Sequence, residues 1–384
     1  MRRAAAASVL VAAGLGLSAC SSDGGGSGSG PGSSTASSSS APSSAPSSAP
    51  PSAAAGQASA GEPAVFAKDL AAPWGVVFLP DGTALASERD THRLVTVSAR
   101  GAVTQVGSVP GVMADAGEGG LLGLALSPRF AQDRTVFAYY TSEEDNRVVT
   151  FRYDGGTASG FTPVLTGIPS ASTHNGGRIA FGPDGHLYVT TGDAQQPDRA
   201  PDDDYLGGKV LRMTAAGKPA PGNPDPSSVV WTKGHRNPQG LAFGPDGKVY
   251  EAEFGQNSQD EINLLEAGKD YGWPSVEGDN GSAPGKTAPL ATFSTSDASP
   301  SGLVYAGGSL WLAALGGERL YRLPLTGGAG SGIGDPQVLL EGEYGRLRTV
   351  VTAPDGALWV TTSNRDGRGD PADDDDRIIR IPLS

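Results

Sequence analysis

A histidine and an aspartate lie on either side of one predicted β-hairpin. His174 lies in the glycine-flanked stretch 173–178 (THNGGR), and Asp193 follows the second strand of the same hairpin. Histidine changes its protonation near neutral pH, and a carboxylate bonded to the ring fixes the tautomer and raises the basicity. The two residues therefore predict a general base with a supporting carboxylate. A surface histidine beside a capping aspartate is the alternative that spacing alone leaves open.

Two further motifs carry clustered polar donors. Arg236, Asn237 and Gln239 are held close together by glycines and a proline, so they offer fixed donors to an anionic or carbonyl-rich ligand. Arg346 and Arg348 lie two apart, a spacing that puts both guanidiniums on one face of a strand and suits a carboxylate or phosphate. Structural hydrogen bonds and surface salt bridges are the competing explanations.

A fourth motif is rich in oxygen ligands. The backbone carbonyls of Gly255 and Gln256 and the carboxylates of Asp260 and Glu261 are the donors that a hard cation such as Ca²⁺ takes. Their spacing does not match an EF-hand loop. The stretch 364–367 (NRDG) is a second possible Ca²⁺ site, whereas the aspartate runs elsewhere are expected to be solvated loops.

These motifs accompany an internal repeat. Six segments share an apolar run, a tight turn and an alternating apolar strand, and they begin at Gly75, Leu121, Arg178, Gly240, Gly302 and Thr349. Four of the turns read Pro-Asp-Gly, in which the proline presets φ, the aspartate bonds back to the backbone and the glycine accepts a positive φ. Each segment therefore predicts a β-hairpin. A period of roughly 50–60 residues is typical of a propeller. We predict an all-β fold, a six-bladed β-propeller with four-stranded antiparallel blades. A β-sandwich would not explain six similar segments.

Composition excludes several classes of protein. The chain has 384 residues and a formal net charge of −13, which argues against nucleic-acid binding because phosphate contacts need a basic surface. Its one cysteine excludes a disulfide framework and a cysteine-based metal site.

The N-terminal region predicts a signal peptide followed by a flexible tether. Residues 1–19 are typical of a lipoprotein signal peptide, with Cys20 as the lipidated residue after cleavage. Residues 20–61 are almost wholly Ser, Gly, Ala and Pro, which predicts a disordered tether, and 62–384 form the propeller. We expect a protein lipid-anchored to the cell membrane on its extracellular face. An ordinary secretory signal is the alternative.

Taken together, five separated motifs resemble those of the soluble pyrroloquinoline-quinone (PQQ)-dependent sugar dehydrogenases, the glucose/sorbosone and aldose sugar dehydrogenase family. The motifs occur in the family's order, at 117–123 (GEGGLLG), 174–193, 234–247, 253–274 and 346–356. The resemblance implies a six-bladed propeller, in agreement with the repeat count.

The resemblance also implies a role for each motif. His174 matches the base that takes the proton of the sugar's anomeric hydroxyl, Asp193 its supporting carboxylate, and Arg236 the arginine beside the quinone carbonyl. The residues that match PQQ-binding positions are Glu118, Arg236, Asn237, Gln239, Arg346 and Arg348. Those that match Ca²⁺ positions are Gly255 and Gln256 at the cofactor, and Asp260, Glu261 and Tyr271 at a structural ion.

The implied reaction oxidises an aldose to its lactone, with hydride passing to PQQ and electrons then passing to an external acceptor. Glu118 stands where the soluble glucose enzymes carry Gln, and a carboxylate there weakens binding of an anionic cofactor unless it is protonated or paired. Gly316 stands where some members carry a Lys. These departures leave open a propeller without cofactor that binds a glycan or protein at the cell surface. A Ca²⁺-dependent hydrolase or lactonase is a third reading. Sugar contacts are expected from the loops 198–205 and 277–287.

Overall fold

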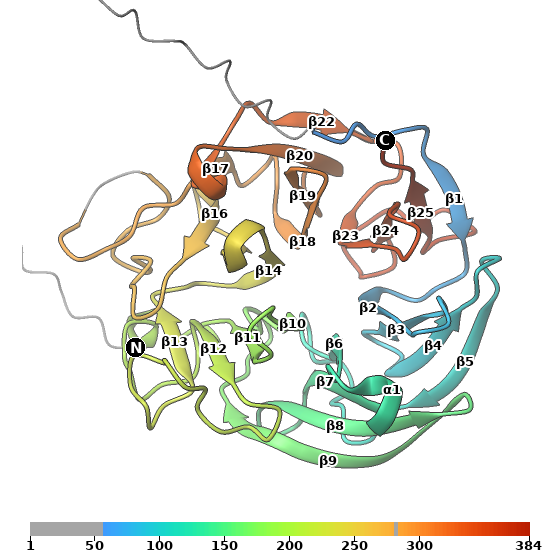
Figure 1. Cartoon of the computed structure of the whole chain (residues 1–384), viewed down its shortest axis with the longest axis horizontal. Coiled ribbons are helices and arrows are strands. Elements are labelled where there is room, and N and C mark those ends of the chain that lie inside the picture. Colours follow the sequence, from blue (N-terminus) through green and yellow to red (C-terminus); the bar gives the residue numbers. More distant parts are fainter. Residues whose placement is uncertain (1–56, 280–282) are drawn as a thin grey trace, which may run out of the picture. The chain divides into compact units, whose positions relative to one another are not determined.

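The six repeated segments form the inner hairpins of six antiparallel sheets (Figure 1). The computed structural model describes residues 57–279 and 283–384. The inner hairpins are β2 (Pro73–Phe78) with β3 (Ala84–Glu88), β6 (Leu121–Leu126) with β7 (Thr135–Thr141), β10 (Ile179–Phe181) with β11 (Leu187–Thr191), β14 (Pro238–Phe243) with β15 (Val249–Glu253), β18 (Pro300–Ala306) with β19 (Ser309–Ala314), and β23 (Leu347–Thr352) with β24 (Leu358–Thr362). The predicted six-bladed propeller is confirmed.

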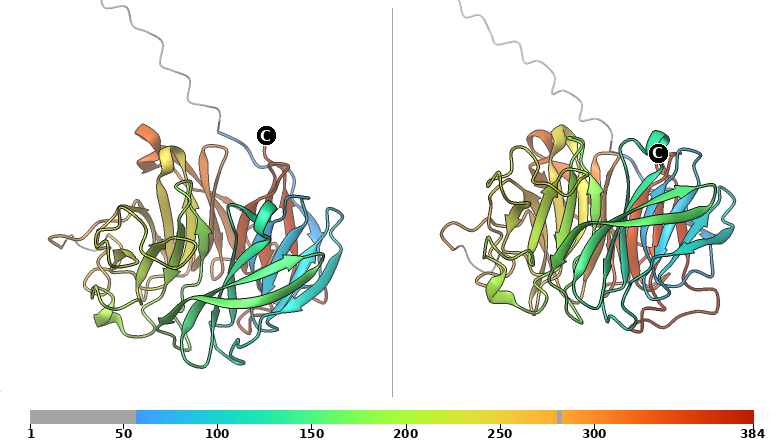
Figure 2. Two further views of the ribbon diagram at one scale, coloured as in Figure 1. Left: turned by 60° about the horizontal axis from the view of Figure 1, so that its bottom comes forward. Right: turned by 90° about the horizontal axis from the view of Figure 1, so that it is seen from below.

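Outer strands complete each blade to four positions. They are β4 (Arg93–Val97) and β5 (Val103–Ser108), β8 (Asn146–Asp154) and β9 (Thr157–Ile168), β12 (Lys209–Met213) and β13 (Val230–Lys233), β16 (Gln259–Leu265) and β17 (Ala291–Ser294), β20 (Arg319–Thr326) with β21 (Gly332–Ile333) and β22 (Gln337–Leu339), and β25 (Ile378–Ile381) with β1 (Ala64–Ala67). In the fifth blade the outermost position is shared by two short strands, which both pair with β20. The long β8–β9 hairpin runs along the rim of the molecule (Figure 2).

Helices are few and short. The described residues contain one α-helical turn, α1 (Phe130–Asp133), and 3₁₀ turns at Pro197–Arg199, Pro245–Gly247 and Gly328–Gly330. No helix in the described part of the chain has the length and apolar character needed to cross a bilayer.

Three of the four Pro-Asp-Gly turns share one geometry. In the first, Gly82 has a φ of 84° and its N–H donates to the carbonyl of Leu79 at 2.9 Å, while Asp81 accepts from the N–H of Thr83. The turn at Pro245–Gly247 differs, because Asp246 also has a positive φ, of 56°. The local signal therefore predicts where the chain turns even where the turn type varies.

The sixth blade is built from both ends of the folded body. The strand β1 pairs with β25, with Val65 opposite Ile379. Residues 57–61, which the sequence assigns to the tether, lie along the propeller instead: Ala60 forms a bridge with Leu383, and Ala58 donates its N–H to the carbonyl of Gly307 at 2.9 Å. The folded body therefore includes residue 57, and the predicted signal peptide and Cys20 lie outside the described residues.

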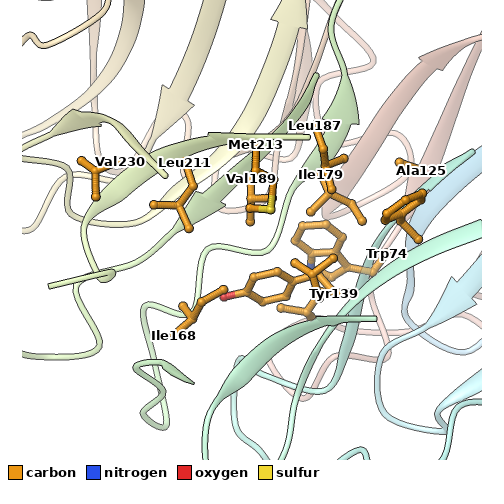
Figure 3. Close-up of a cluster of buried hydrophobic side chains, with 13 residues drawn as sticks. Trp74, Ala125, Tyr139, Ile168, Ile179, Leu187, Val189, Leu211, Met213 and Val230 are labelled. Carbon is orange, nitrogen blue, oxygen red and sulfur yellow. The ribbon is translucent and has the colours of Figure 1, made fainter. Parts of the chain in front are cut away.

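Apolar side chains fill the spaces between neighbouring blades. Figure 3 shows Trp74 of the first blade, Tyr139 of the second and Val189 of the third in one buried cluster. The hydroxyl of Tyr139 donates to the carbonyl of Asn175 at 2.8 Å, so this core also supports the loop next to His174.

The innermost strands gather the predicted site residues at one end of the central channel. The innermost strands of the six blades surround the centre of the ring (Figure 1); they are β2, β6, β10, β14, β18 and β23. Because every blade repeats the same strand order, we infer that these strands all start at the same mouth of the channel. Arg178 links inner strands of different blades: its guanidinium donates to the carbonyl of Gln239 at 2.9 Å and to Thr349 Oγ1 at 3.2 Å. A cavity of about 300 Å³ lies among the apolar residues of the inner strands, and Arg178 lines it.

Candidate active site

The structure brings His174 and Asp193 together. His174 Nδ1 lies 2.7 Å from Asp193 Oδ1, and the other carboxylate oxygen accepts from the indole of Trp273 at 2.8 Å. Asp193 is buried, and its Oδ1 also accepts the N–H of Gln195. The carboxylate is held from two sides, so it fixes the imidazole ring through Nδ1 and leaves Nε2 available to take a proton.

The loop of His174 is held in an unusual backbone conformation. His174 has a φ of 60°, a region that non-glycine residues rarely adopt. A Cβ on Gly192 would lie 2.0 Å from the carbonyl oxygen of His174, so only glycine fits there. Asn237 secures the next turn, because its Oδ1 accepts the N–H of Gly176 at 3.0 Å. The buried Asn237 thus positions the histidine loop, a role that its motif alone did not indicate.

Glu118 is paired. One oxygen accepts the backbone N–H of His174 at 3.1 Å, and the other forms a 2.7 Å ion pair with Arg368. Burial raises the pKa of Glu118, but the hydrogen bonds and charges of Arg368 and His174 outweigh it, so the net pKa lies below its ordinary value. Arg368 is therefore the counter-ion of Glu118, so this carboxylate does not present an uncompensated negative charge to an anionic ligand. Arg368 was not predicted.

Arg236 presents an unused donor. Its Nε is buried and has no hydrogen-bond partner, whereas Nη1 contacts the carbonyl of Phe254 at 3.4 Å. Its guanidinium lies 5.5 Å from the ring centroid of Trp273, the indole that also holds Asp193. Burial lowers the pKa of Arg236, although nearby carboxylates including Asp193 oppose that shift. A buried guanidinium with an orphaned donor beside a histidine base fits an anionic or carbonyl ligand.

Arg346 and Arg348 converge as predicted, and they meet on a carboxylate of the protein itself. Both guanidiniums contact Asp366 Oδ2, at 3.1 and 3.0 Å, and the Asp366 side chain is only 1% exposed. Burial and the neighbouring Arg89 lower the pKa of Arg348 to about 10. Gln239 joins the group, since its Oε1 lies 3.5 Å from Arg348 Nη1.

Asp366 is therefore an arginine partner, which argues against the possible Ca²⁺ site at 364–367. Burial raises the pKa of Asp366, but Arg348 and Arg346 outweigh it and the net pKa is lowered.

The predicted carbonyl ligands lie in a turn that wraps around a carboxylate. The N–H groups of residues 256–259 all donate to Glu277 Oε1, at distances from 2.7 to 3.2 Å. A Cβ on Gly255 would lie 1.9 Å from the carbonyl of Gln259, so the turn needs glycine there. Four backbone donors outweigh the effect of burial and lower the pKa of Glu277. Glu277, which sequence reasoning placed only in a sugar loop, thus shapes the turn that holds Gly255 and Gln256.

The structure does not bring the side chains of Asp260, Glu261 and Tyr271 to one point. Asp260 and Glu261 are adjacent in β16 and so face opposite sides of the sheet. Asp260 accepts the N–H groups of Gly255 and Ser299, at 2.8 and 2.6 Å, and burial raises its pKa to about 6. The Tyr271 hydroxyl donates to a backbone carbonyl. Asp260 therefore stabilises the Gly255 turn by accepting a hydrogen bond from its backbone.

One predicted sugar loop contacts the site directly. In 198–205, the hydroxyl of Tyr205 donates to the carbonyl of Asp193 at 3.0 Å. Behind it, Lys209 Nζ donates to the carbonyls of Ala200 and Gly207, each at 2.7 Å. The other loop, 277–287, includes residues outside the described part of the chain.

Comparison with known proteins identifies the family. The glucose/sorbosone dehydrogenase family matches residues 70–379. The chain belongs to this family. It is 35% identical over 283 residues to quinoprotein glucose dehydrogenase B of Acinetobacter calcoaceticus, covering 64% of this chain and 59% of that protein. It is 30% identical to the aldose sugar dehydrogenase YliI of Escherichia coli over 77% of this chain and 88% of that one.

Solved structures give the same answer. The PQQ-bound aldose sugar dehydrogenase of Streptomyces coelicolor is 49% identical and superposes with a TM-score of 0.82, over 86% of this chain and 99% of that one. A Thermus thermophilus protein described as a putative oxidoreductase (glucose dehydrogenase) is 42% identical, with a TM-score of 0.79 over 84% of this chain and 99% of that one. The glucose/sorbosone dehydrogenase relatives are thus oxidoreductases of the quinoprotein type.

Proposed function

We propose that the protein oxidises an aldose to its lactone with PQQ as cofactor. The observation that carries this proposal is the His174–Asp193 pair, at 2.7 Å, beside the orphaned buried donor of Arg236. A base and a cation fixed side by side suit a reaction that removes a proton from a hydroxyl while negative charge develops on a neighbouring acceptor. Family membership supports the same chemistry.

The residues at the mouth fit an anionic quinone. Arg236 offers its free Nε, and Arg346 and Arg348 form a cationic pair that already holds one carboxylate, that of Asp366. We infer that the carboxylates of PQQ bind these arginines, and that the carbonyls of Gly255 and Gln256 hold the Ca²⁺ that accompanies it. Glu118 does not oppose binding, because Arg368 neutralises it.

When bound, PQQ would accept the hydride from the sugar carbon. The chain's own part is proton transfer and positioning. His174 takes the hydroxyl proton at Nε2, because Nδ1 is engaged with Asp193. Asp193 stabilises the resulting imidazolium, and Trp273 keeps the carboxylate in place. Arg236 offsets the negative charge that arrives on the acceptor side. The hydroxyl oxygen loses the proton and the carbon that bears it loses the hydride. This carbon and oxygen together become the lactone carbonyl.

A direct assay tests the proposal. Purified protein beginning at Gln57 would be incubated with PQQ and CaCl₂ and assayed with an artificial electron acceptor and a panel of aldoses. We expect acceptor reduction together with a PQQ-dependent rise in Tm. The absence of both would refute the proposal, and hydrolysis of lactones without an acceptor would favour a hydrolase.

We further propose that Cys20 carries a lipid that holds the enzyme at the extracellular face of the membrane, where an external acceptor takes the electrons. The support is the sequence of residues 1–20. Replacing Cys20 with Ala should release the protein from the membrane fraction into the medium. Retention of the Cys20→Ala variant in the membrane fraction would contradict the anchor.

A further inference from the structure

One inner strand carries a long, charged side chain where the other inner strands carry small residues. The pairing registers place Arg178 level with the following residues of the other five blades: Gly75, Gly123, Gly240, Gly302 and Thr349. A Cβ on Gly302 would lie 2.6 Å from the backbone nitrogen of Val350, so neighbouring strands approach closely at this level. Of these six residues, only Arg178 has a side chain long enough to reach across the channel.

The Arg178 guanidinium contacts three other blades through neutral acceptors. Its Nε donates to the carbonyl of Gln239 at 2.9 Å, Nη1 to the carbonyl of Trp74 at 3.4 Å, and Nη2 to Oγ1 of Thr349 at 3.2 Å. The guanidinium carbon lies 4.1 Å from the ring centroid of Trp74, so the indole covers one face of the cation. A guanidinium has five N–H hydrogens and these contacts use three, so each Nη atom keeps one hydrogen for a further acceptor.

No carboxylate compensates the charge of Arg178. Within residues 57–279 and 283–384, Arg178 forms no ion pair, in contrast to Arg346 and Arg348, which share the carboxylate of Asp366. Burial lowers the pKa of Arg178 to about 9, and the nearby charge of Arg348 adds to this shift. Charged groups in protein interiors are normally paired, because removing an ion from water is costly. The centre of the channel therefore favours an anion.

Arg178 also lines the apolar cavity of about 300 Å³. The other residues that line this cavity are all apolar and come from the six inner strands, as Val77 and Val304 do. They follow the level of Arg178 along these strands, whereas His174 and Arg236 precede it. The cavity therefore lies on the opposite side of Arg178 from the candidate active site. Its volume is at the lower end of the range of small-molecule sites.

We propose that this cavity binds a monocarboxylate with a short aliphatic chain. The carboxylate accepts the remaining Nη hydrogens of Arg178, a fork that suits its two oxygens, and the chain lies among the apolar residues. An inorganic anion would leave the apolar walls uncovered, and a neutral apolar molecule would leave the guanidinium without a counter-ion. A carboxylate with an aliphatic chain meets both requirements. This site does not depend on the proposed function.

A series of ligands tests the two halves of the site separately. Acetate, butanoate and hexanoate share the carboxylate, whereas hexan-1-ol keeps the chain and lacks the charge. Isothermal titration calorimetry of the full-length protein, without PQQ, should show one bound hexanoate, with an affinity that rises about fourfold for each buried methylene along the series. Hexan-1-ol should bind about tenfold more weakly, because it lacks the charge-assisted hydrogen bonds. Equal affinities for acetate and hexanoate would indicate an adventitious ion only, and equal affinities for hexanoate and hexan-1-ol would exclude a role for the charge.

A substitution in the cavity wall tests the position of the chain. Val304→Phe places a larger side chain in the wall and leaves Arg178 unchanged, so it should abolish hexanoate binding. Val338→Phe is the matched control, because Val338 is 44% exposed on β22, away from the cavity, and it should bind hexanoate as the wild type does. Wild-type affinity for hexanoate in Val304→Phe would overturn the proposal.

Substitutions of two arginines test the position of the carboxylate. Arg178→Met keeps a long apolar side chain and removes the charge, so hexan-1-ol should then bind at least as tightly as hexanoate. Arg346→Gln changes a guanidinium of the candidate active site and should keep the wild-type affinity for hexanoate. Loss of binding in Arg346→Gln would place the carboxylate at the active site and overturn the proposal, whether or not Arg178→Met folds.

Discussion

At the residue scale, the site depends on one imidazole ring whose two nitrogens have separate tasks. Asp193 contacts Nδ1, and Trp273 and Gln195 donate hydrogen bonds to Asp193, so the proposed function assigns Nε2 to the substrate. The backbone of His174 itself lies in the left-handed region, with a φ of 60°. Chemistry and positioning can therefore be separated by substitution.

Replacing His174 with Gln should remove the base and leave the cationic part of the site in place. We expect kcat to fall by about a hundredfold or more, the usual contribution of a general base. The PQQ-dependent rise in Tm should remain, since the arginines are unchanged. Activity within a few-fold of the wild type would show that His174 is not the base.

Replacing Trp273 with Phe should act through Asp193. Loss of the indole donor leaves one oxygen of Asp193 without this partner, so the carboxylate holds the imidazole of His174 less firmly, and we expect kcat to fall about tenfold. The PQQ-dependent rise in Tm should remain. Steady-state kinetics measure the fall in kcat. Trp231→Phe, a substitution in β13, should keep the wild-type kcat, and an unchanged kcat in Trp273→Phe would exclude the positioning role.

At the element scale, loops that follow the inner hairpins carry the site, and buried polar groups hold these loops. Lys209, the first residue of β12, anchors the loop 198–205 through its two carbonyl contacts. Burial lowers the pKa of this amine to about 7, although nearby aspartates oppose the effect.

The lowered pKa of Lys209 predicts how stability changes with pH. Between about pH 7 and pH 10 the unfolded chain still binds a proton that the folded protein has lost, so the free energy of unfolding rises with pH, by at most ~1.4 kcal/mol per unit. Urea unfolding across this range should show the rise in wild type. In Lys209→Met the slope should be smaller, even though the variant is less stable overall. Parallel pH dependences in the two proteins would contradict the assignment.

The sequence allowed the strands and the central pair of the site to be predicted, because both rest on local signals. Proline, aspartate and glycine define a turn wherever they occur, and His174 and Asp193 flank a single hairpin. The roles of Arg368 and Trp273 escaped prediction because their partners are distant in the chain: Arg368 and Glu118 are 250 residues apart, and Trp273 and Asp193 are 80 apart. Asp366 was predicted as part of a possible Ca²⁺ site, whereas the structure pairs it with Arg346 and Arg348.

Four buried polar residues of the fourth blade, Glu251, Glu253, Glu261 and Asn263, form a cluster that the sequence predicts only in part. Glu251 and Glu253 alternate along β15, as Glu261 and Asn263 do along β16, so each pair shares a face. Only the register of the two strands shows that these faces are the same one, and the sequence does not fix that register.

At the scale of the whole molecule, the ring of blades is closed by residues from both ends of the folded body. Val65 and Ala67 of β1 pair with the last blade strand, and Phe66 packs on Trp359 with ring centroids 4.5 Å apart. Residues 57–61 extend this seam. The closing pair joins the first and the last strand of the propeller, which lie at opposite ends of its sequence.

Removing the closing strand should loosen the ring. A protein beginning at Lys68 lacks β1 and exposes the edge of β25, so we expect a lower Tm and self-association through that edge. A protein beginning at Gln57 is the control and should match the full chain. Thermal unfolding and size-exclusion chromatography measure both effects, and identical Tm values for the two truncated proteins would show that the seam contributes no stability.

The guanidinium of Arg178 joins inner strands of the first, fourth and sixth blades, through the carbonyls of Trp74 and Gln239 and the hydroxyl of Thr349. Under the proposed function, these contacts within the central channel favour entry of sugar and electron acceptor from the same mouth. We therefore expect the acceptor to bind after the oxidised sugar has left. Initial rates at varied sugar and acceptor should give parallel double-reciprocal lines, the pattern of a ping-pong enzyme, with inhibition at high sugar concentration. Intersecting lines would mean that sugar and electron acceptor can be bound at the same time, which would contradict this order.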